Sequence, residues 1–360
     1  MRALIVGGTF DADGGKESKI ITEMAQSLGW DFINGGSIDK IREFDPTNLD
    51  VLLWMPNINN DEDKILPSLK KQWQRMVLIS SKRAEARPEQ QREEYSHFEV
   101  VSRLLKTKSN LGIMIQKDEG RFSFSLMDPL GNRFIKTQRV SELSSAIANR
   151  VNTLKSLTRI GSSHAGQPPK NITLVSDAFI QTVRTLGDEF STHVNAVNPE
   201  RLLGNAAARD TYRSTRCTHG FPSVRAGDNT FWISRRNVDK QTMNSSDFVL
   251  VGADENRVNY YGDPAIKPSV DSPIQIRLFN FYSNVSFMVH GHVYAENAPT
   301  TKSKVPCGHI EEFDEIKALF PDPQTTNFTV NLKGHGCLIL SNNLEYLQNA
   351  TFESRPLPEV

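Results

Sequence analysis

Two histidines in the C-terminal half of the chain, His290 and His292, are separated by one residue within a strand-like run from Val285 to Tyr294. Because successive side chains of a strand point to opposite faces, residues two apart point the same way and can reach one cation. A third histidine, His335, has glycine on both sides, which leaves the backbone free to aim the ring. Three imidazoles and one exchangeable position are typical of catalytic zinc. The alternative is three ordinary core or surface histidines, the usual explanation of a lone His-x-His.

These histidines belong to a set of motifs that follow one another in a fixed order. As an ordered set, the motifs resemble the class II aldolase/adducin family. The similarity is greatest to its L-ribulose-5-phosphate 4-epimerase branch, in which a Lys-Pro-Ser-Ser-Asp element precedes the His-x-His strand at this separation. The resemblance extends from about Asp177 to Val360. The motifs are Lys267-Pro-Ser-Val-Asp271-Ser-Pro273, Val289-His290-Gly-His292, Val305-Pro-Cys307 with Asp314-Glu-Ile316 after it, and Gly334-His335-Gly336.

This resemblance implies an α/β/α sandwich around a mainly antiparallel sheet, a divalent metal that is usually zinc, and a C4 homotetramer with sites between subunits. Carried onto this chain, it makes His290, His292 and His335 the metal ligands. It places Asp271 in the acidic position, as a further ligand or as a proton carrier. Zinc bound to the carbonyl and hydroxyl oxygens of a sugar-phosphate-like substrate stabilises the enediolate formed when a C–C bond breaks or a proton leaves. Outside this set of motifs, Asp271 would be read as a turn or cap residue.

The chain departs from the family pattern where the substrate phosphate is held. The family's Gly-Asn-x-Ser turn is here Gly220-Phe-Pro-Ser223, without the asparagine, and two arginines replace the small residues of its Pro-Ser-Gly turn. A guanidinium can bind a phosphate or a carboxylate through two parallel hydrogen bonds. The alternative for this pair is a solvated basic turn. The residues expected to contact the substrate are Ser223, Arg235, Arg236, Lys267 and Ser269.

An aspartate that the epimerase branch carries between the His-x-His strand and the Ile-Pro-Cys segment is also missing. Retro-aldol cleavage or dehydration is therefore better supported than true epimerisation, with Tyr294, Glu296 and Glu311 as the nearest replacement acids. The cysteines and His309 stay outside the expected ligand set, because cysteine is more often a small buried hydrophobe than a ligand.

The N-terminal part alternates short β-rich runs with helix-like stretches, as in an α/β unit on a largely parallel sheet. The pattern predicts a Rossmann-like or flavodoxin-like domain. A strong turn signal at Asp128-Pro-Leu-Gly-Asn132 predicts an antiparallel hairpin at the sheet edge. The expected strands are 3–6, 31–33, 51–55, 76–80, 111–116, 122–126 and 133–136, and the expected helices are 17–28, 65–75, 95–106 and 140–157.

Glycines end the first two strands of this domain. Gly7, Gly8 and Thr9 precede a helix, so backbone N–H groups and a helix N-terminus could hold a phosphate or a nucleotide there. The spacing matches neither the P-loop nor the dinucleotide-binding motif, and the glycines could equally make a tight turn with Asp11 or Asp13 as the helix cap. A second pair, Gly35-Gly36, ends the next strand at the same edge of the sheet.

The domain boundary is expected in a segment rich in small, polar and proline residues. We expect an α/β domain over 1–160, a linker over 161–171 and the metal-binding domain over 172–360. Helices are expected at 177–194 and 199–213.

Composition narrows the classes of function. The 360 residues carry 42 basic and 42 acidic side chains, so no overall charge attracts nucleic acid or an anionic membrane. Three cysteines and no membrane-length apolar run favour a reducing, cytoplasmic location. We expect a zinc-dependent lyase, or a related epimerase or dehydratase, that forms a homo-oligomer. The alternatives are an adducin-like assembly module, and nucleotide or sugar-nucleotide binding or transfer by the N-terminal domain with the second domain as an oligomerisation module.

Overall fold

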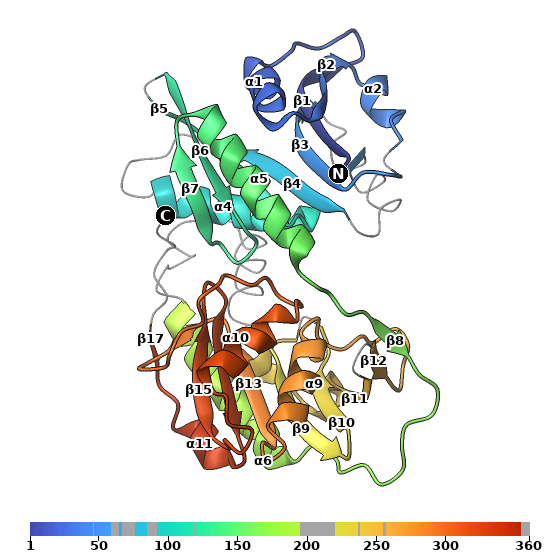
Figure 1. The fold of residues 1–360 in the computed structure, drawn as a ribbon, viewed down its shortest axis with the longest axis vertical. Helices are drawn as coiled ribbons and strands as arrows, with labels where there is room; N and C mark the ends of the chain where they lie inside the picture. The colour runs from blue at the N-terminus through green and yellow to red at the C-terminus, as the bar shows by residue number, and fades with distance from the viewer. Residues whose placement is uncertain are drawn as a thin grey trace. The chain divides into compact units, whose positions relative to one another are not determined.

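The computed structural model describes residues 1–45, 47–58, 65–66, 76–84, 92–118, 120–194, 220–236, 238–254 and 257–353. They form two compact units, of which the first comprises Met1–Ser156 and the second begins at Leu157 (Figure 1). None of the helices in these residues has the length and hydropathy that a membrane span requires.

The first unit is built on a seven-stranded sheet in the order β2-β1-β3-β4-β5-β6-β7. The first five strands of this order are parallel, and β6 and β7 add an antiparallel hairpin. The order 2-1-3-4-5 is the flavodoxin-like one of the two predicted alternatives. The strands are β1 (Ala3–Asp11), β2 (Asp31–Ser37), β3 (Val51–Ile58), β4 (Val77–Arg83), β5 (Leu111–Asp118), β6 (Arg121–Met127) and β7 (Arg133–Thr137).

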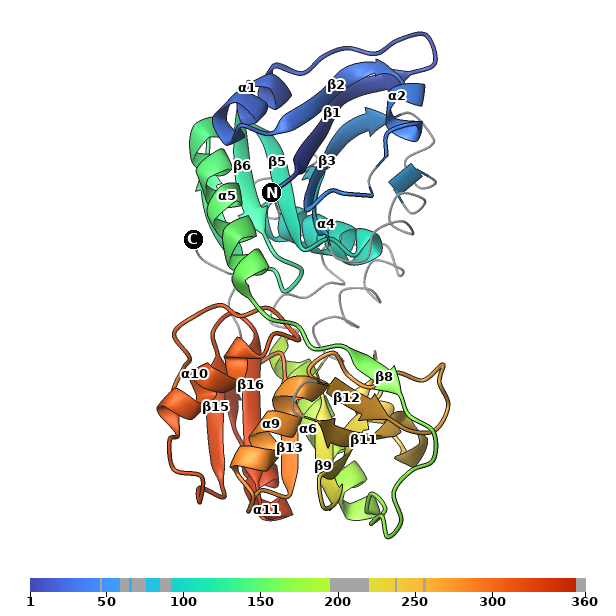
Figure 2. The ribbon, with the colours of Figure 1, turned by 45° about the vertical axis from the view of Figure 1, so that its right-hand side comes forward.

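Helices cover both faces of this sheet (Figure 2). Helices α1 (Lys19–Leu28) and α5 (Val140–Ser156) bury Ile21, Met24 and Ile147 against one face. Helices α2 (Asp39–Arg42) and α4 (Arg92–Thr107) cover the other, where Leu104 packs on Gly112 of β5. Both strands of the predicted hairpin form. Only Ile65 and Leu66 of the helix expected at 65–75 are among the described residues.

The second unit contains an eight-stranded sheet in the order β15-β16-β13-β9-β10-β11-β12-β8. The pairs are antiparallel except β12–β8, so the sheet is mixed but mainly antiparallel, as predicted. The strands are β8 (Ser162–His164), β9 (Pro222–Gly227), β10 (Thr230–Ser234), β11 (Phe248–Asp254), β12 (Arg257–Tyr260), β13 (Phe287–Gly291), β15 (Phe328–Leu332) and β16 (Gly336–Ser341). Because β8 lies inside the expected linker of 161–171, part of that segment is paired in the sheet.

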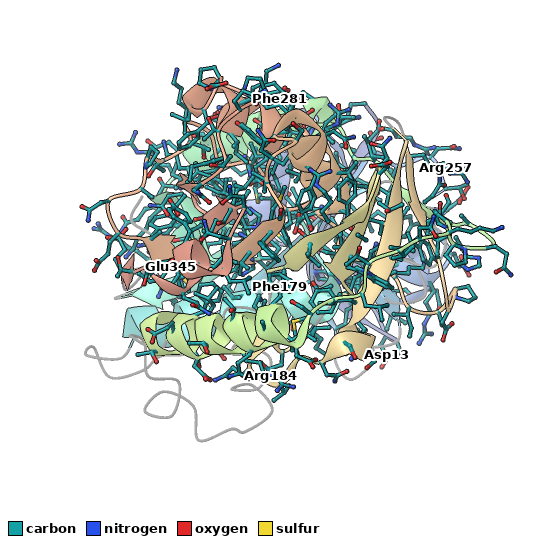
Figure 3. All side chains as sticks on the ribbon, turned by 90° about the horizontal axis from the view of Figure 1, so that it is seen from below. Asp13, Phe179, Arg184, Arg257, Phe281 and Glu345 are labelled. Carbon is teal, nitrogen blue, oxygen red and sulfur yellow. The ribbon has the colours of Figure 1, made fainter. Side chains whose placement is uncertain are left out.

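Among the described residues, two helices cover each face of this sheet, which gives the predicted α/β/α sandwich. Helices α6 (Asp177–Val194) and α11 (Leu344–Gln348) pack on the face of Val289 and Ile339. Helices α9 (Ser272–Phe281) and α10 (Glu311–Leu319) pack on the face of Met288 and Leu338. Phe179 of α6 and Phe281 of α9 accordingly lie on opposite sides of the sheet (Figure 3). The helix expected at 199–213 lies outside the described residues.

Candidate metal centre

Strand pairing brings the three histidines together. In the antiparallel ladder of β13 and β16, His290 is opposite Leu338 and Gly291 is opposite Cys337. His335 lies in the turn between β15 and β16, two residues before Cys337, and therefore beside the end of β13. The candidate ligand atoms of His290, His292 and His335 all lie within 4.8 Å of one another, and the three residues are buried. The structure thus brings the predicted ligand set into one place, although His292 lies just beyond the last residue of β13.

Glycine is necessary for this close approach of turn and strand. Gly336 has a φ of +147°, and a Cβ there would lie 2.0 Å from the carbonyl oxygen of Gly291. A side chain would push the turn away from β13 and move His335 out of the group. The Gly-His-Gly sequence therefore serves backbone approach as well as the freedom to aim the ring.

Hydrogen bonds at Nδ1 set the orientation of two of the rings. His290 Nδ1 lies 2.7 Å from the carbonyl oxygen of Cys337, which can only accept, so this nitrogen donates. His335 Nδ1 lies 2.9 Å from Glu312 Oε1. Both rings therefore direct Nε2 into the space between them, and these two nitrogens are 3.3 Å apart. Two lone pairs cannot face each other at this distance in a dry interior without a shared proton or cation.

The donor set fits a divalent metal. Two Zn–N bonds of usual length at a tetrahedral angle separate the nitrogens by about 3.3 Å, which is the separation of the two Nε2 atoms. Metal-binding histidines generally donate their other ring N–H to a carboxylate or a carbonyl oxygen, which fixes the tautomer. His335 and His290 show both of these partners, Glu312 and the Cys337 carbonyl.

Glu312 and Cys307 complete the surroundings of His335. The Cys307 Sγ lies 3.0 Å from His335 Nε2. Burial alone would lower the pKa of His335, but the nearby Cys307 and Glu312 raise it well above its usual value. Burial also raises the pKa of the Glu312 carboxyl, and His335 opposes that change. The Glu312 carboxylate is thus buried, and its hydrogen bond to His335 counteracts the effect of burial on its pKa.

Asp271 lies close to this cluster but outside the metal-binding group found in the described residues. It is 5% exposed and precedes α9, yet its side chain does not cap that helix. Instead, its Oδ1 accepts the Gly308 N–H at 2.6 Å. The Asp271 charge acts to raise the pKa of Cys307, Glu312 and Arg236. This position suits a proton carrier beside the metal group.

The expected substrate contacts fall into two groups. Arg236 and Ser269 interact with Asp271, and Ser223 is opposite Met288 of β13, two residues before His290. Burial lowers the pKa of Arg236, Arg159 adds to this, and Asp271 opposes it; the guanidinium Nε donates to the Pro268 carbonyl at 3.0 Å. Ser269 Oγ accepts the Asp271 N–H at 3.3 Å. Ser223 Oγ is fully buried with no hydrogen-bond partner among the described residues.

The other two expected contacts have different surroundings. Arg235 forms an ion pair with Asp247 at 2.8 Å, so a carboxylate of the protein already partly neutralises its guanidinium. The side chain of Lys267 is exposed, and its carbonyl oxygen accepts the Arg236 N–H at 3.1 Å.

The proposed replacement acids are also placed. Tyr294 Oη accepts the Gly334 N–H at 2.7 Å, next to His335. Glu296 is exposed, and Glu311 Oε1 accepts the Thr158 N–H at 2.7 Å. Of these three residues, only Tyr294 borders the histidine turn.

Sequence reasoning missed two buried residues next to the cluster. Glu312 is four residues before the buried Ile316 on α10, and this i, i+4 relation to an apolar residue was the available signal for a carboxylate facing the core. Lys240 is fully buried, and a Cβ built on Gly220 would lie 2.9 Å from its Nζ and 2.1 Å from the carbonyl oxygen of His290. No local pattern indicated that this lysine lies behind His290.

The fold of the second unit and its group of three histidines agree with the predicted resemblance. Residues 205–323 match the family described as Class II Aldolase and Adducin N-terminal domain, so the resemblance predicted for this part of the chain is confirmed. A comparison with curated proteins gave no match.

Solved structures with partial similarity belong to more than one kind of protein. An L-fuculose 1-phosphate aldolase is 15% identical over 49% of this chain and 81% of its own, with a TM-score of 0.33. The L-fuculose-1-phosphate aldolase from Thermus thermophilus is 14% identical over 48% and 84%, with a TM-score of 0.30. The DNA/pantothenate metabolism flavoprotein from Streptococcus pneumoniae is 13% identical over 43% and 99%, with a TM-score of 0.33.

Proposed function

We propose that the second unit is a divalent metal-dependent lyase of the class II aldolase type that acts on a small sugar-phosphate-like substrate. The observation that carries the proposal is the buried group of His290, His292 and His335, with two Nε2 atoms 3.3 Å apart. Zinc is the metal that this all-imidazole set suits best. The match of residues 205–323 to the aldolase/adducin family supports the same class of chemistry.

The bound metal would supply Lewis-acid stabilisation of the enediolate that develops on the substrate when a C–C bond breaks. The residues of the chain have separate tasks. Glu312 holds His335 in one tautomer through Nδ1, and the Cys337 carbonyl does the same for His290. Asp271, held by the Gly308 N–H, would accept or return the proton. Arg236 would attract the anionic end of the substrate and Tyr294 would serve as an acid, with retro-aldol cleavage favoured over epimerisation.

Metal content per chain, measured by elemental mass spectrometry, tests the site. We expect about one zinc per chain in the wild type and loss of zinc in His290→Ala. His164→Ala is the matched control, because His164 is an exposed histidine of β8. Absence of metal from the wild type after zinc is supplied would contradict the proposal and favour a structural or assembly role for this unit.

Activity is tested on a panel of phosphorylated ketoses and related hydroxy-carbonyl compounds, with release of the aldehyde product as the signal. Chelation of the metal should abolish turnover, and zinc should restore it. We also expect a homo-oligomer, which light scattering on the purified chain would detect. A metal-loaded protein that turns over none of these substrates would leave the metal centre in place but overturn the lyase assignment.

A further inference from the structure

A cavity of about 480 Å³ opens in the first unit at the carboxyl ends of its parallel strands. It is lined by the ends of β1, β3, β4 and β5 and by the start of α1. The strand order 2-1-3 reverses between β1 and β3, and ligands of open α/β sheets bind where the order reverses. The volume is within the range of pockets that hold small molecules and cofactors.

Cationic side chains predominate in this cavity. Lys16, Lys82, Arg83 and Arg103 line it, and Glu17 is the only acidic residue among the lining residues of the described chain. Lys82 also pairs with Glu99 at 3.7 Å, outside the cavity lining. Because Glu99 partly neutralises Lys82, the positive charge that favours a ligand with several negative charges includes that of Lys16 and Arg83, against the carboxylate of Glu17.

The N-terminus of α1 adds to this positive field. Its N-cap residue, Ser18, lines the cavity and makes no side-chain cap hydrogen bond, and the first turn contains no acidic residue. Asn34 of β2 supports the loop from the side: its Oδ1 accepts the Ser18 N–H at 2.8 Å, and its Nδ2 donates to the Ser18 carbonyl at 3.1 Å. The positive end of the helix dipole therefore faces the same space as the four cations.

Gly8, Thr9 and Lys16 form part of the cavity wall. Gly8 has a φ of +83°, and a Cβ there would lie 2.6 Å from the backbone nitrogen of Gly35. Thr9 N donates to the Lys16 carbonyl at 2.8 Å, which folds the loop back and holds Lys16 at the cavity. Gly7 has a different task, because a Cβ there would lie 2.2 Å from Ile21 Cδ1, so it lets α1 pack closely on β1. Of the three residues with a predicted phosphate role, Gly8 and Thr9 line the cavity.

Apolar side chains also line the cavity. Met55, Ile115 and Phe122 line it, and Phe122 is 40% exposed although it is a large hydrophobic residue. An exposed aromatic side chain beside a cationic pocket offers a surface on which a flat ring can stack. The ligand that fits both parts carries a polyphosphate group and an aromatic ring system.

We propose that this cavity binds a nucleoside triphosphate, with its phosphates at Lys16, Arg83 and the start of α1 and its base against Phe122. The proposal does not depend on the function of the metal centre, since every residue that it uses lies in the first unit.

Isothermal titration calorimetry of the full-length chain tests the proposal with the four ribonucleoside triphosphates as probes. We expect at least one of them to bind with a stoichiometry of one. Lys16→Ala and Arg83→Ala should each weaken binding about tenfold or more, because each removes a charge-assisted contact to phosphate. Arg139→Ala removes the same charge from a side chain that is 77% exposed and does not line the cavity, and should change the affinity less than about twofold.

Inorganic tripolyphosphate and the free nucleosides distinguish the two parts of the ligand. Phe122→Ala should weaken binding of the triphosphate and leave binding of tripolyphosphate unchanged. Equal affinity for tripolyphosphate and nucleotide, with no effect of Phe122→Ala, would overturn the nucleoside part of the proposal. No binding of any triphosphate at millimolar concentration, or equal weakening by Arg139→Ala, would overturn it entirely. Binding should persist in His290→Ala, so that failure of the metal centre and failure of this site give different results.

Discussion

Replacement of Glu312 by glutamine isolates the contribution of one charge to the proposed metal centre. The Glu312 Oε1 lies 2.9 Å from His335 Nδ1, and both side chains are buried. Glutamine has nearly the same shape and still offers an oxygen to Nδ1, so the His335 ring should keep its orientation. The carboxylate charge, which makes the imidazole a stronger metal ligand, is lost.

The size of the effect follows from the surroundings. Removal of such a carboxylate partner generally costs about 10- to 100-fold in metal affinity, which corresponds to about 1.4 to 2.7 kcal/mol. We expect the upper part of this range, since the Glu312 side chain is only 5% exposed and solvent screens its charge little. Glu312→Ala should also destabilise the metal-free fold, by about 1 to 3 kcal/mol, because it leaves the buried His335 N–H without an acceptor.

Competition with a chromophoric zinc chelator measures the dissociation constant of each variant. Glu315→Gln is the matched control, because this carboxylate lies on the same helix and bonds to Ser303 and Lys302 at the surface. It should leave zinc affinity unchanged. Unaltered zinc affinity in Glu312→Gln, or an equal loss in Glu315→Gln, would refute the reasoning that Glu312 acts on the metal through His335.

Three further predictions concern other parts of the second unit. Gly220→Ala should destabilise the fold by about 3 kcal/mol in a thermal melt, since the φ of Gly220 is +132° and the new Cβ would lie 2.1 Å from the His290 carbonyl oxygen. Gly166→Ala is the control and should be nearly neutral, because no atom lies within 4 Å of its added Cβ. Asp271→Asn should lower kcat about 100-fold or more and keep one zinc per chain, whereas loss of zinc would make this residue a ligand; Asp263→Asn, in an exposed turn, is the control. Burial raises the pKa of Tyr282 from 10.0 to about 12, so the unfolded chain ionises first, and stability that is complete below pH 10 should fall by about 2 kcal/mol by pH 12. Tyr282→Phe should lack this loss of stability. The prediction would be contradicted if the free energy of unfolding, measured by denaturation from pH 10 to 12, fell equally in the two proteins.

The regular elements were largely predictable because their signals are local. Apolar runs and helical spacing predicted α6 with both ends correct, and α1 to within two residues at its start. The strand ends were less accurate. β1 continues through its glycines to Asp11, because Gly7 to Phe10 pair with Met55 to Ile58 of β3, and each partner is 48 residues away in sequence. A strand end that depends on a distant neighbour has no local signature.

The grouping of the three histidines was predictable from the sequence, and their surroundings were less so. The two-residue spacing of His290 and His292 and the glycines around His335 are sequence features, and the structure brings the three rings together. The Glu312 contact depends on how α10 packs on the sheet. The ion pair that occupies Arg235 also required the fold, because Asp247 reaches it only through the pairing of β10 with β11.

Side-chain chemistry, hydrophobic periodicity and glycine positions are properties of the sequence alone. The amino-acid sequence by itself therefore determined two α/β units, most of the strands and helices of the first, α6 of the second, the resemblance to the aldolase/adducin family and the three histidines. The tertiary structure decided which charges face one another. It gathers Lys16, Arg83 and Phe122 from three separate segments of the chain at one cavity, and it buries Glu312 beside His335. The physical reason is that burial and charge pairing arise between segments far apart in sequence, and only the packed fold sets those distances.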